Sequence, residues 1–316
     1  NFTKAAFVYR QLPSAFFQRK KIKILDLGCG PGTASMAFLS ECAGKKPGAS
    51  FEISLVDQNK NILTDAQKFL NFWHSALQTL GPLKIQSHRS PVMGWRSSQR
   101  YDLIVLHHVL NEMTQLKAHQ RADWLQRLAE KHLKENGVLA LMEPALKRPG
   151  RELMALRDHL LESYPLEVLA PCLHERPCPM LAGTRQDWCH FYVDWPEPSF
   201  LKQLDRLIGN ENRFLKLSYL LMCPSGALPQ ALTRKPSYYR VVSNRMATRG
   251  KTEVVLCGEP GRIRISLLDR QQSKKNQLLK NVKRGDLVEW TEWKSSEYAV
   301  NGNFRLHEES LLKKIN

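Results

Sequence analysis

Three cysteines in one short, proline-containing run have the residue type and spacing of a metal site. They are Cys172, Cys178 and Cys189, separated by five and by ten residues. Thiolates are soft ligands that favour zinc or iron–sulfur clusters. The prolines of the run disfavour a regular helix and suit a chain that wraps around a centre.

A metal site of this kind needs a fourth ligand. Our choice is Cys257, which ends a predicted strand beside a glycine, and the alternatives are Cys223, His174 and His190. Zinc sites commonly use C-x2–4-C pairs, which this run lacks. Cluster ligands vary more in spacing and often neighbour a proline. The spacing therefore favours an iron–sulfur cluster, with zinc as the alternative.

A glycine-rich loop directly after a predicted strand is a candidate cofactor site. In DLGCGPG the glycines Gly28, Gly30 and Gly32 alternate, and Asp26 precedes them. Glycine adopts positive φ and, lacking Cβ, lets a ligand approach the backbone. The helix that follows presents free N–H groups. The spacing resembles the S-adenosylmethionine loop of Rossmann-like methyltransferases more than the G-x-G-x-x-G of dinucleotide enzymes.

Further cofactor candidates lie in this loop and at the ends of later strands. Cys29 lies in the loop, where its backbone could contact the cofactor. Asp57 ends the second strand, where methyltransferases use an acid to hold the ribose hydroxyls. It follows the first loop glycine by 29 positions, not the roughly 20 of the dinucleotide fingerprint. Asn111 and Glu112 follow a third strand and either orient the acceptor or cap the next element.

The sequence names no catalytic base. The (D/N/S)-PP-(Y/F) tetrad of amino-methylases is absent where the chain reads HHVLNEM. Pro171-Cys172 resembles the nucleophile of C5-cytosine methylases, but the neighbouring cysteines favour metal ligation. His107 and His108 lie on an apolar strand, so we expect them to be packed. A binding or assembly role therefore stays open beside catalysis.

Alternating strands and helices must position these groups. The alternation predicts an α/β fold, with an open parallel Rossmann-like methyltransferase sheet and helices on both faces. The predicted strands cover 21–27, 51–57, 101–110 and 138–144, and the predicted helices 33–43, 59–80, 115–134, 151–163 and 200–222.

The predicted secondary structure changes after the cysteine run. From Tyr238 onward, short strands predict a small antiparallel module, with an OB-like barrel as one form of it. We expect three parts: a cofactor domain over 1–165, a Cys-rich segment over 166–200 and a basic β-rich module over 201–316.

The charge is strongly basic and unevenly spread. The chain carries 47 Lys and Arg against 30 Asp and Glu, and residues 201–316 hold 22 against 11. Such an excess suits RNA, although a solvated basic surface would also account for it. Tyr238, Tyr239, Trp290 and Trp293 are expected to fill the module's core rather than stack on bases. The candidate RNA contacts are Arg234, Lys235, Arg240, Arg245, Arg249, Arg262 and Arg264.

Three motifs together resemble one family. P-C-x-H-E-x-P-C-P-M from Pro171, W-C-H-F from Trp188 and L-N-E from Leu110 are similar to the mitochondrial small-ribosomal-subunit methyltransferase-like family and its bacterial relatives. The likeness covers nearly the whole chain. It implies an S-adenosylmethionine fold, association with small-subunit rRNA during assembly, and a four-iron–four-sulfur cluster held by Cys172, Cys178, Cys189 and Cys257.

These observations define one function class and one alternative. We expect an S-adenosylmethionine-binding, iron–sulfur rRNA methyltransferase or assembly factor of the small ribosomal subunit. The alternative is a small-molecule or protein methyltransferase with a structural zinc. No apolar run is long enough to span a membrane, and we expect a monomer. The lack of an obvious leader favours a cytoplasmic bacterial relative, with the mitochondrial matrix as the alternative.

Overall fold

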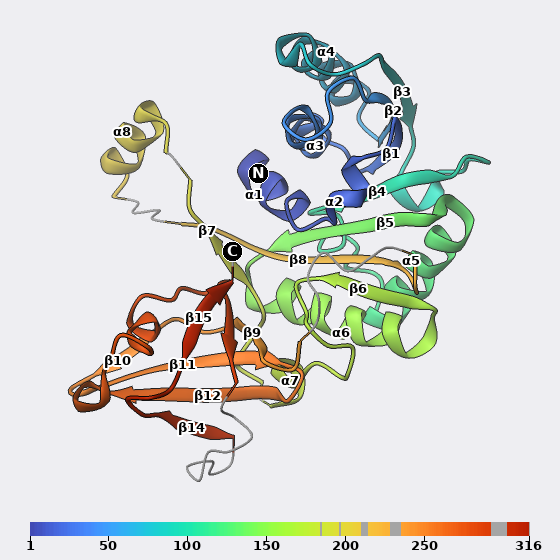
Figure 1. The fold of residues 1–316 in the computed structure, drawn as a ribbon. Helices are drawn as coiled ribbons and strands as arrows, with labels where there is room; N and C mark the ends of the chain where they lie inside the picture. Colours follow the sequence, from blue (N-terminus) through green and yellow to red (C-terminus); the bar gives the residue numbers. More distant parts are fainter. Residues whose placement is uncertain (184, 196, 210–213, 228–234, 292–301, 316) are drawn as a thin grey trace.

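The computed structural model describes residues 1–316 apart from 184, 196, 210–213, 228–234, 292–301 and 316 (Figure 1). Within the described residues, an eight-stranded sheet and a seven-stranded sheet organise the chain. Helices surround the first sheet, and the second sheet lies beside it at the other end of the molecule (Figure 1).

The first sheet has the strand order β3-β2-β1-β4-β5-β8-β6, and short β7 pairs with β8. The strands from β3 to β5 are parallel, whereas β8 runs antiparallel to its neighbours. The order reverses between β1 and β4, which is where open sheets bind ligands. The strands are β1 (Lys21–Leu27), β2 (Ser50–Asp57), β3 (Leu83–Arg89), β4 (Tyr101–His107), β5 (Leu133–Pro144), β6 (Leu166–Ala170), β7 (Phe191–Val193) and β8 (Leu215–Pro224).

Helices cover both faces of this sheet, which confirms the predicted fold class. Strand β1 shows why, because Ile24 packs with α1 to α4 and Leu25 with α5 and α6. Successive side chains of a strand point to opposite faces. No described helix is long and apolar enough to cross a membrane. The helices are α1 (Phe2–Tyr9), α2 (Ser14–Phe17), α3 (Thr33–Ala43), α4 (Lys60–Leu77), α5 (Ala118–His132), α6 (Lys147–Ser163), α7 (Pro179–Gly183) and α8 (Ser199–Leu207), with 3-10 turns η1 (Val92–Gly94), η2 (Asp269–Gln271) and η3 (Gln277–Lys280).

The predicted helix over 200–222 was wrong. This stretch forms the short helix α8 and then strand β8. Residues 217–223 of β8 are all buried, and periodicity alone cannot distinguish such a continuous apolar run from a buried helix. Strand β8 also belongs to the first sheet, so that sheet extends past the boundaries expected at 165 and 201.

The second sheet has the order β14-β12-β11-β9-β13-β15, with β10 paired to β11. Its pairs are antiparallel except β12 with β14. Tyr239 and Trp290 lie in its core, which confirms that these aromatic residues pack. The described pairings form an open row, so the OB-like barrel stays a prediction. The strands are β9 (Tyr238–Val241), β10 (Met246–Thr248), β11 (Lys251–Gly258), β12 (Gly261–Leu268), β13 (Leu287–Trp290), β14 (Asn303–Leu306) and β15 (Leu312–Ile315).

The Cys-rich segment connects the two sheets. It leaves the first sheet after β6, and its helix α7 packs against β12 of the second sheet (Figure 1). The chain then returns through β7, which pairs with β8. The segment therefore reaches both sheets, as the cysteine pattern requires.

Candidate cofactor pocket and cysteine centre

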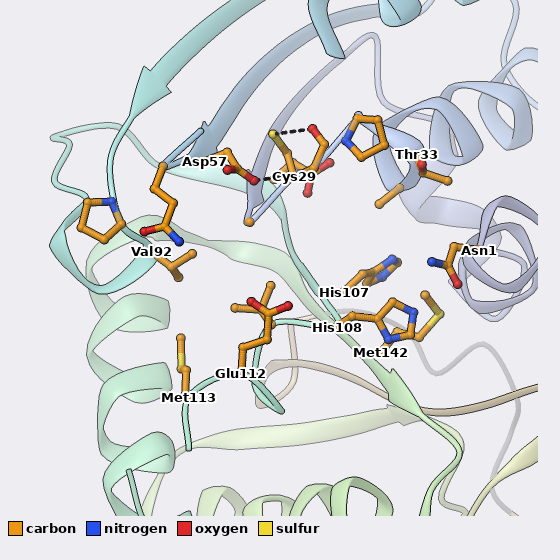
Figure 2. A pocket seen from close by; sticks show the side chains of 18 of the residues that line it. Asn1, Cys29, Thr33, Asp57, Val92, His107, His108, Glu112, Met113 and Met142 are labelled. Atoms are coloured by element: carbon orange, nitrogen blue, oxygen red, sulfur yellow. Dashed lines mark hydrogen bonds between the residues drawn. The ribbon is translucent and has the colours of Figure 1, made fainter. Parts of the chain in front are cut away.

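A pocket of about 490 Å³ lies at the carboxyl ends of β1, β2 and β4 (Figure 2). We call it the cofactor pocket. Figure 2 shows Asp57 and Cys29 on one side of it, and His107, His108 and Glu112 on another. These groups come from three strand ends, so the sheet topology alone brings them together.

The glycine loop has the backbone that its sequence predicts. Gly28, Gly30 and Gly32 have φ values of 68°, 50° and 78°, a region that side-chain-bearing residues rarely adopt. A Cβ on Gly28 would lie 2.7 Å from Cγ2 of Val109, whereas one on Gly30 would meet no atom within 4 Å. Gly28 therefore serves packing, and Gly30 leaves open space for a ligand.

Asp57 ties the glycine loop to the start of α4. Its Oδ2 accepts a hydrogen bond from the Gly30 amide at 3.1 Å, and its Oδ1 accepts one from the Asn59 amide at 2.9 Å. Asn59 in turn caps α4, because its side chain accepts from the amides of Asn61 and Ile62. The carboxylate is thus fixed in orientation where it lines the pocket.

Asp26 also lines the pocket but is almost fully buried. The Ser35 hydroxyl donates to its Oδ2 at 2.6 Å. Burial raises the pKa of Asp26 to about 6, against the opposing effect of that hydrogen bond. The aspartate therefore supports the loop from beneath and changes its charge just below neutral pH.

Asn111 and Glu112 have different surroundings. Glu112 lines the cofactor pocket, whereas Asn111 lines a separate small cavity beside Glu143. In the amide orientation that satisfies both partners, the Asn111 nitrogen donates to Glu143 Oε2 and to the His108 carbonyl, both at 2.8 Å. Burial raises the pKa of Glu143 to about 7. The Asn111 side chain thus holds the loop after β4 and does not line the cofactor pocket.

His107 and His108 line the pocket, a position that the sequence reasoning missed. His107 also stacks on Tyr9, with ring centroids 5.7 Å apart. Burial lowers the pKa of His107 to about 3 and that of His108 to about 4, so both rings are neutral near pH 7. Among the described residues, neither Nε2 atom has a hydrogen-bond partner.

The four predicted cysteine ligands come together between the two sheets. Cys178 lies in an apolar cluster against which Cys189 and Cys257 also pack. Burial raises the thiol pKa of Cys189 and Cys257, and the nearby charges of Cys172 and Cys178 add to both shifts. Cys257 also lies 3.6 Å, Sγ to Nε2, from His174. Four cysteines from two distant stretches, residues 172–189 and β11, therefore lie close to one another.

The arrangement of these sulfurs does not suit a single ion. Among the described residues, no group of three or more His, Cys, Asp or Glu side chains is placed to hold one metal ion. A tetrahedral zinc site draws its sulfurs to about 2.3 Å from one centre.

Two residues that the sequence reasoning missed support the cysteine segment. Asp158 accepts hydrogen bonds from the Cys178 amide at 2.9 and 3.1 Å. Buried Arg157 donates to the carbonyls of His174 and Arg176 at 2.6 and 2.7 Å. Both lie on α6, whose pattern predicts a helix but carries no sign of this role.

The structure divides the predicted RNA contacts. Arg262 and Arg264 point from one face of β12 into a common pocket, whereas Lys235, Arg245 and Arg249 are exposed elsewhere. Arg240 does not fit a surface role, because it is buried and donates to the Gly285 carbonyl at 3.1 Å. Arg234 and Trp293 lie outside the described residues.

The fold is a Rossmann-like α/β fold with a pocket where the order of its parallel strands reverses. A family model described as "Mitochondrial small ribosomal subunit Rsm22" matches residues 8–290. The chain belongs to this family. No curated protein matches the chain.

Solved structures give more distant likenesses. A putative sarcosine dimethylglycine methyltransferase from Galdieria sulphuraria shares 14% identity, covering 70% of this chain and 85% of that one, with a TM-score of 0.39. An S-adenosylmethionine-dependent methyltransferase from Methanosarcina mazei shares 14%, covering 69% and 97%, with a TM-score of 0.39. A putative class I methyltransferase from Listeria monocytogenes shares 11%, covering 71% and 59%, with a TM-score of 0.41. Scores this low carry no argument about function.

Proposed function

We propose that the chain binds S-adenosylmethionine in the cofactor pocket and acts on, or assembles, the small ribosomal subunit. One observation supports cofactor binding. Where the strand order reverses between β1 and β4, the pocket lies beside a loop with three positive-φ glycines and is lined by Asp57, a fixed acid at the end of β2. The open space at Gly30 admits the ligand to the backbone, and the Asp57 carboxylate would accept from ribose hydroxyls. Cys29 would contribute its backbone.

Titration calorimetry tests the cofactor. We expect S-adenosylmethionine and S-adenosylhomocysteine to bind with one-to-one stoichiometry, and Gly30→Val to abolish binding because its side chain fills the open space. A Gly250→Val variant, at another exposed positive-φ glycine, is the matched control for backbone strain. Unchanged binding by Gly30→Val would contradict the site.

We also assign Cys172, Cys178, Cys189 and Cys257 as ligands of a four-iron–four-sulfur cluster. Their shared burial and mutual electrostatic influence support this. When bound, the cluster would supply cross-linking between β6, β7 and β11. The chain's own residues prepare the site, since Asp158 fixes the Cys178 amide and Arg157 fixes the turn at His174.

Anaerobic purification tests this assignment. The protein should be brown and contain iron and sulfide, and Cys257→Ser should lose both. Cys42→Ser, at a buried cysteine of α3 outside the group, is the control and should keep them. Colourless protein with one zinc per chain would instead support the alternative enzyme, which no described residue favours at present.

The partner would be small-subunit rRNA, held by the predicted contacts that are exposed or line a pocket, which are Lys235, Arg245, Arg249, Arg262 and Arg264. Filter binding should weaken steeply with salt, because phosphate contacts release counterions. Comparing rRNA methylation with and without the protein separates the two roles. A lost mark establishes an enzyme, with Glu112 as the candidate that lines the pocket. Unchanged marks with stalled subunits establish an assembly factor.

The family description also bears on the site of action. The family's description names a mitochondrial ribosome, which supports the matrix over the bacterial cytoplasm as the location. The monomeric state stays a prediction, and sedimentation of the purified protein tests it.

A further inference from the structure

A second pocket, of about 500 Å³, lies where β7 and β8 meet the second sheet. We call it the inter-sheet pocket. It is separate from the cofactor pocket but adjoins the cysteine segment, because Trp188, Val242 and Val255 pack in the same apolar cluster as Cys178. Its walls come from β7 on one side and from β12 and the turn before β13 on the other.

Alternate residues leading into β7 place a row of aromatic rings in this pocket. Trp188 and His190 stack with centroids 5.0 Å apart, and Tyr192 follows at 5.6 Å from His190. The intervening residues Cys189 and Phe191 pack toward the core of the first sheet. The strand pattern thus devotes one face to the pocket.

The first ring of this row is held in place. The Trp188 indole N–H donates to the Ala145 carbonyl at 3.1 Å. A Cβ added to Gly150 of α6 would lie 2.7 Å from Trp188 Cδ1, so the indole packs directly on that helix. A fixed aromatic surface loses little conformational entropy when a ligand stacks on it.

Cations surround the aromatic row. Lys216 Nζ and Arg284 Cζ lie 5.5 and 5.8 Å from the centroid of the Tyr192 ring, within cation–π range. Arg262 donates to Asp187 at 3.2 Å, while Arg264 is exposed at the rim. Among the described residues, no carboxylate forms an ion pair with Lys216, Arg264 or Arg284.

Arg284 has buried hydrogen-bond donors without partners among the described residues. Its Nε and Nη1 are buried, and neither has a hydrogen-bond partner among the described residues. Buried donors are nearly always satisfied, and an orphan commonly marks a missing ion, water or ligand. A guanidinium presents its donors in a planar fork that matches phosphate. Arg284 therefore has hydrogen-bonding capacity that no described residue uses, and it lines the pocket.

We propose that the inter-sheet pocket binds an unpaired nucleotide of an RNA strand. The base would lie along the Trp188–Tyr192 row, above an apolar floor that includes buried Val242 and Val255. The phosphate would contact Arg284 and Arg264. The proposal rests on the proposed function for RNA as the partner. The pocket would add a binding site for one base, whereas the exposed basic residues alone would contact only phosphates.

The pocket's chemistry favours RNA over an acidic peptide. A peptide carboxylate would satisfy Arg284 but would offer no planar group to the ring row, whose last ring, Tyr192, stacks on Phe214 with centroids 5.5 Å apart. Unpaired RNA supplies both a planar base and a phosphate, and stacking on aromatic side chains is the usual way in which single strands are bound.

Fluorescence anisotropy with a labelled RNA octamer of uridines tests the proposal. Tyr192→Leu keeps the apolar volume but removes the ring, and Arg264→Gln removes an exposed charge at the rim. Each should weaken binding about ten-fold, as the loss of one stacked base or one charged phosphate contact does. Arg305→Gln, at an exposed arginine of neighbouring β14, is the matched control and should change affinity less than about two-fold, since one exposed charge contributes little.

A strand of eight abasic ribose phosphates separates base from phosphate. We expect it to bind wild type more weakly than the RNA octamer and to be insensitive to Tyr192→Leu. Uridine monophosphate should not compete at concentrations where the octamer does. Its effective competition would mean that the site takes free nucleotides, and would overturn the RNA proposal.

The outcomes distinguish this inference from the proposed function. If full-length rRNA binds wild type and both pocket variants equally, the pocket inference fails while the basic surface stands. If Tyr192→Leu weakens an acidic peptide but not the octamer, the partner is a protein and the inference also fails. If Arg264→Gln weakens binding and Tyr192→Leu does not, the proposal that a base stacks on the aromatic row is likewise overturned.

Discussion

At the scale of single residues, Asp57 connects local geometry to ligand binding. Its two oxygens accept from amides on either side of the pocket entrance, at Gly30 and Asn59. A carboxylate that already satisfies backbone donors keeps its remaining lone pairs aimed at the ligand, since each oxygen accepts more than one hydrogen bond. The side chain therefore needs no rearrangement when hydroxyls arrive.

Replacing Asp57 should weaken cofactor binding. In Asp57→Asn, one oxygen becomes an NH2 donor that faces a backbone N–H, so the site loses an acceptor and its charge. We expect the dissociation constant for S-adenosylmethionine to rise at least ten-fold, or by about 1.4 kcal/mol, by calorimetry. Asp65→Asn, at an exposed aspartate of α4, should leave it unchanged. Equal affinities for both variants would refute the role of Asp57.

The buried Asp26 predicts a pH-dependent stability. Its folded pKa, about 6, lies above the ordinary 3.8, so the folded state prefers the protonated acid. The resulting stability is complete below about pH 4 and is lost as pH rises through 6, by about 3 kcal/mol. Without added cofactor, the melting temperature of Asp26→Asn should therefore rise relative to that of wild type as pH rises from 4 to 7. Parallel curves would show that the burial has no such effect.

At the scale of elements, strand β8 and helix α8 are neighbours in sequence but differ in burial. They should therefore contribute very differently to the free energy of unfolding. Strand β8 lies between β5 and β6, and Leu221 is completely buried there. Helix α8 instead exposes its apolar residues, with Leu207 82% exposed.

Matched leucine truncations should reveal this contrast. Leu221→Ala should cost about 2–5 kcal/mol through lost burial and a cavity, whereas Leu207→Ala should stay within about 0.5 kcal/mol, as exposed positions do. Urea denaturation of each variant gives both free energies of unfolding. A large loss from Leu207→Ala would mean that α8 packs in solution against a surface that it does not contact here.

The sequence predicts elements best where local pattern and tertiary context agree. The helix over 33–43 follows a glycine loop and ends at Gly44, and its bounds were predicted as observed. In strand β3, at a sheet edge, apolar and polar residues alternate only weakly, and β8 is apolar along most of its length. The hydrophobic period therefore indicates a strand in neither segment. These two strands are defined by the neighbours that they pair with, which no local window contains.

The candidate sites show the same division. The glycine loop and Asp57 are contiguous with strands, so their convergence follows from sheet topology. The basic, aromatic inter-sheet pocket draws Lys216 from β8, Trp188 from the segment before β7 and Arg284 from the turn before β13. Only the tertiary arrangement brings them together, so the sequence reasoning did not find it.

At the scale of the whole molecule, the proposed cluster would join the two sheets. Cys257 lies on β11, and the other three ligands lie in the segment between β6 and β7. Removing the metal with a chelator should therefore loosen the second sheet more than the first. Amide exchange should quicken in β11 and over 172–189 but remain slow in β1 and β4. Uniform quickening across both sheets would contradict a local cross-link.

The place of β8 in the first sheet also constrains how the chain is made. Synthesis proceeds from the N-terminus, and residues 215–224 emerge only after the cysteine segment and α8. Until then β5 and β6 have no strand between them, and each presents unpaired backbone groups that invite aggregation. The first sheet therefore cannot complete its strand pairing until most of the polypeptide has emerged, and the open edges of β5 and β6 persist until then.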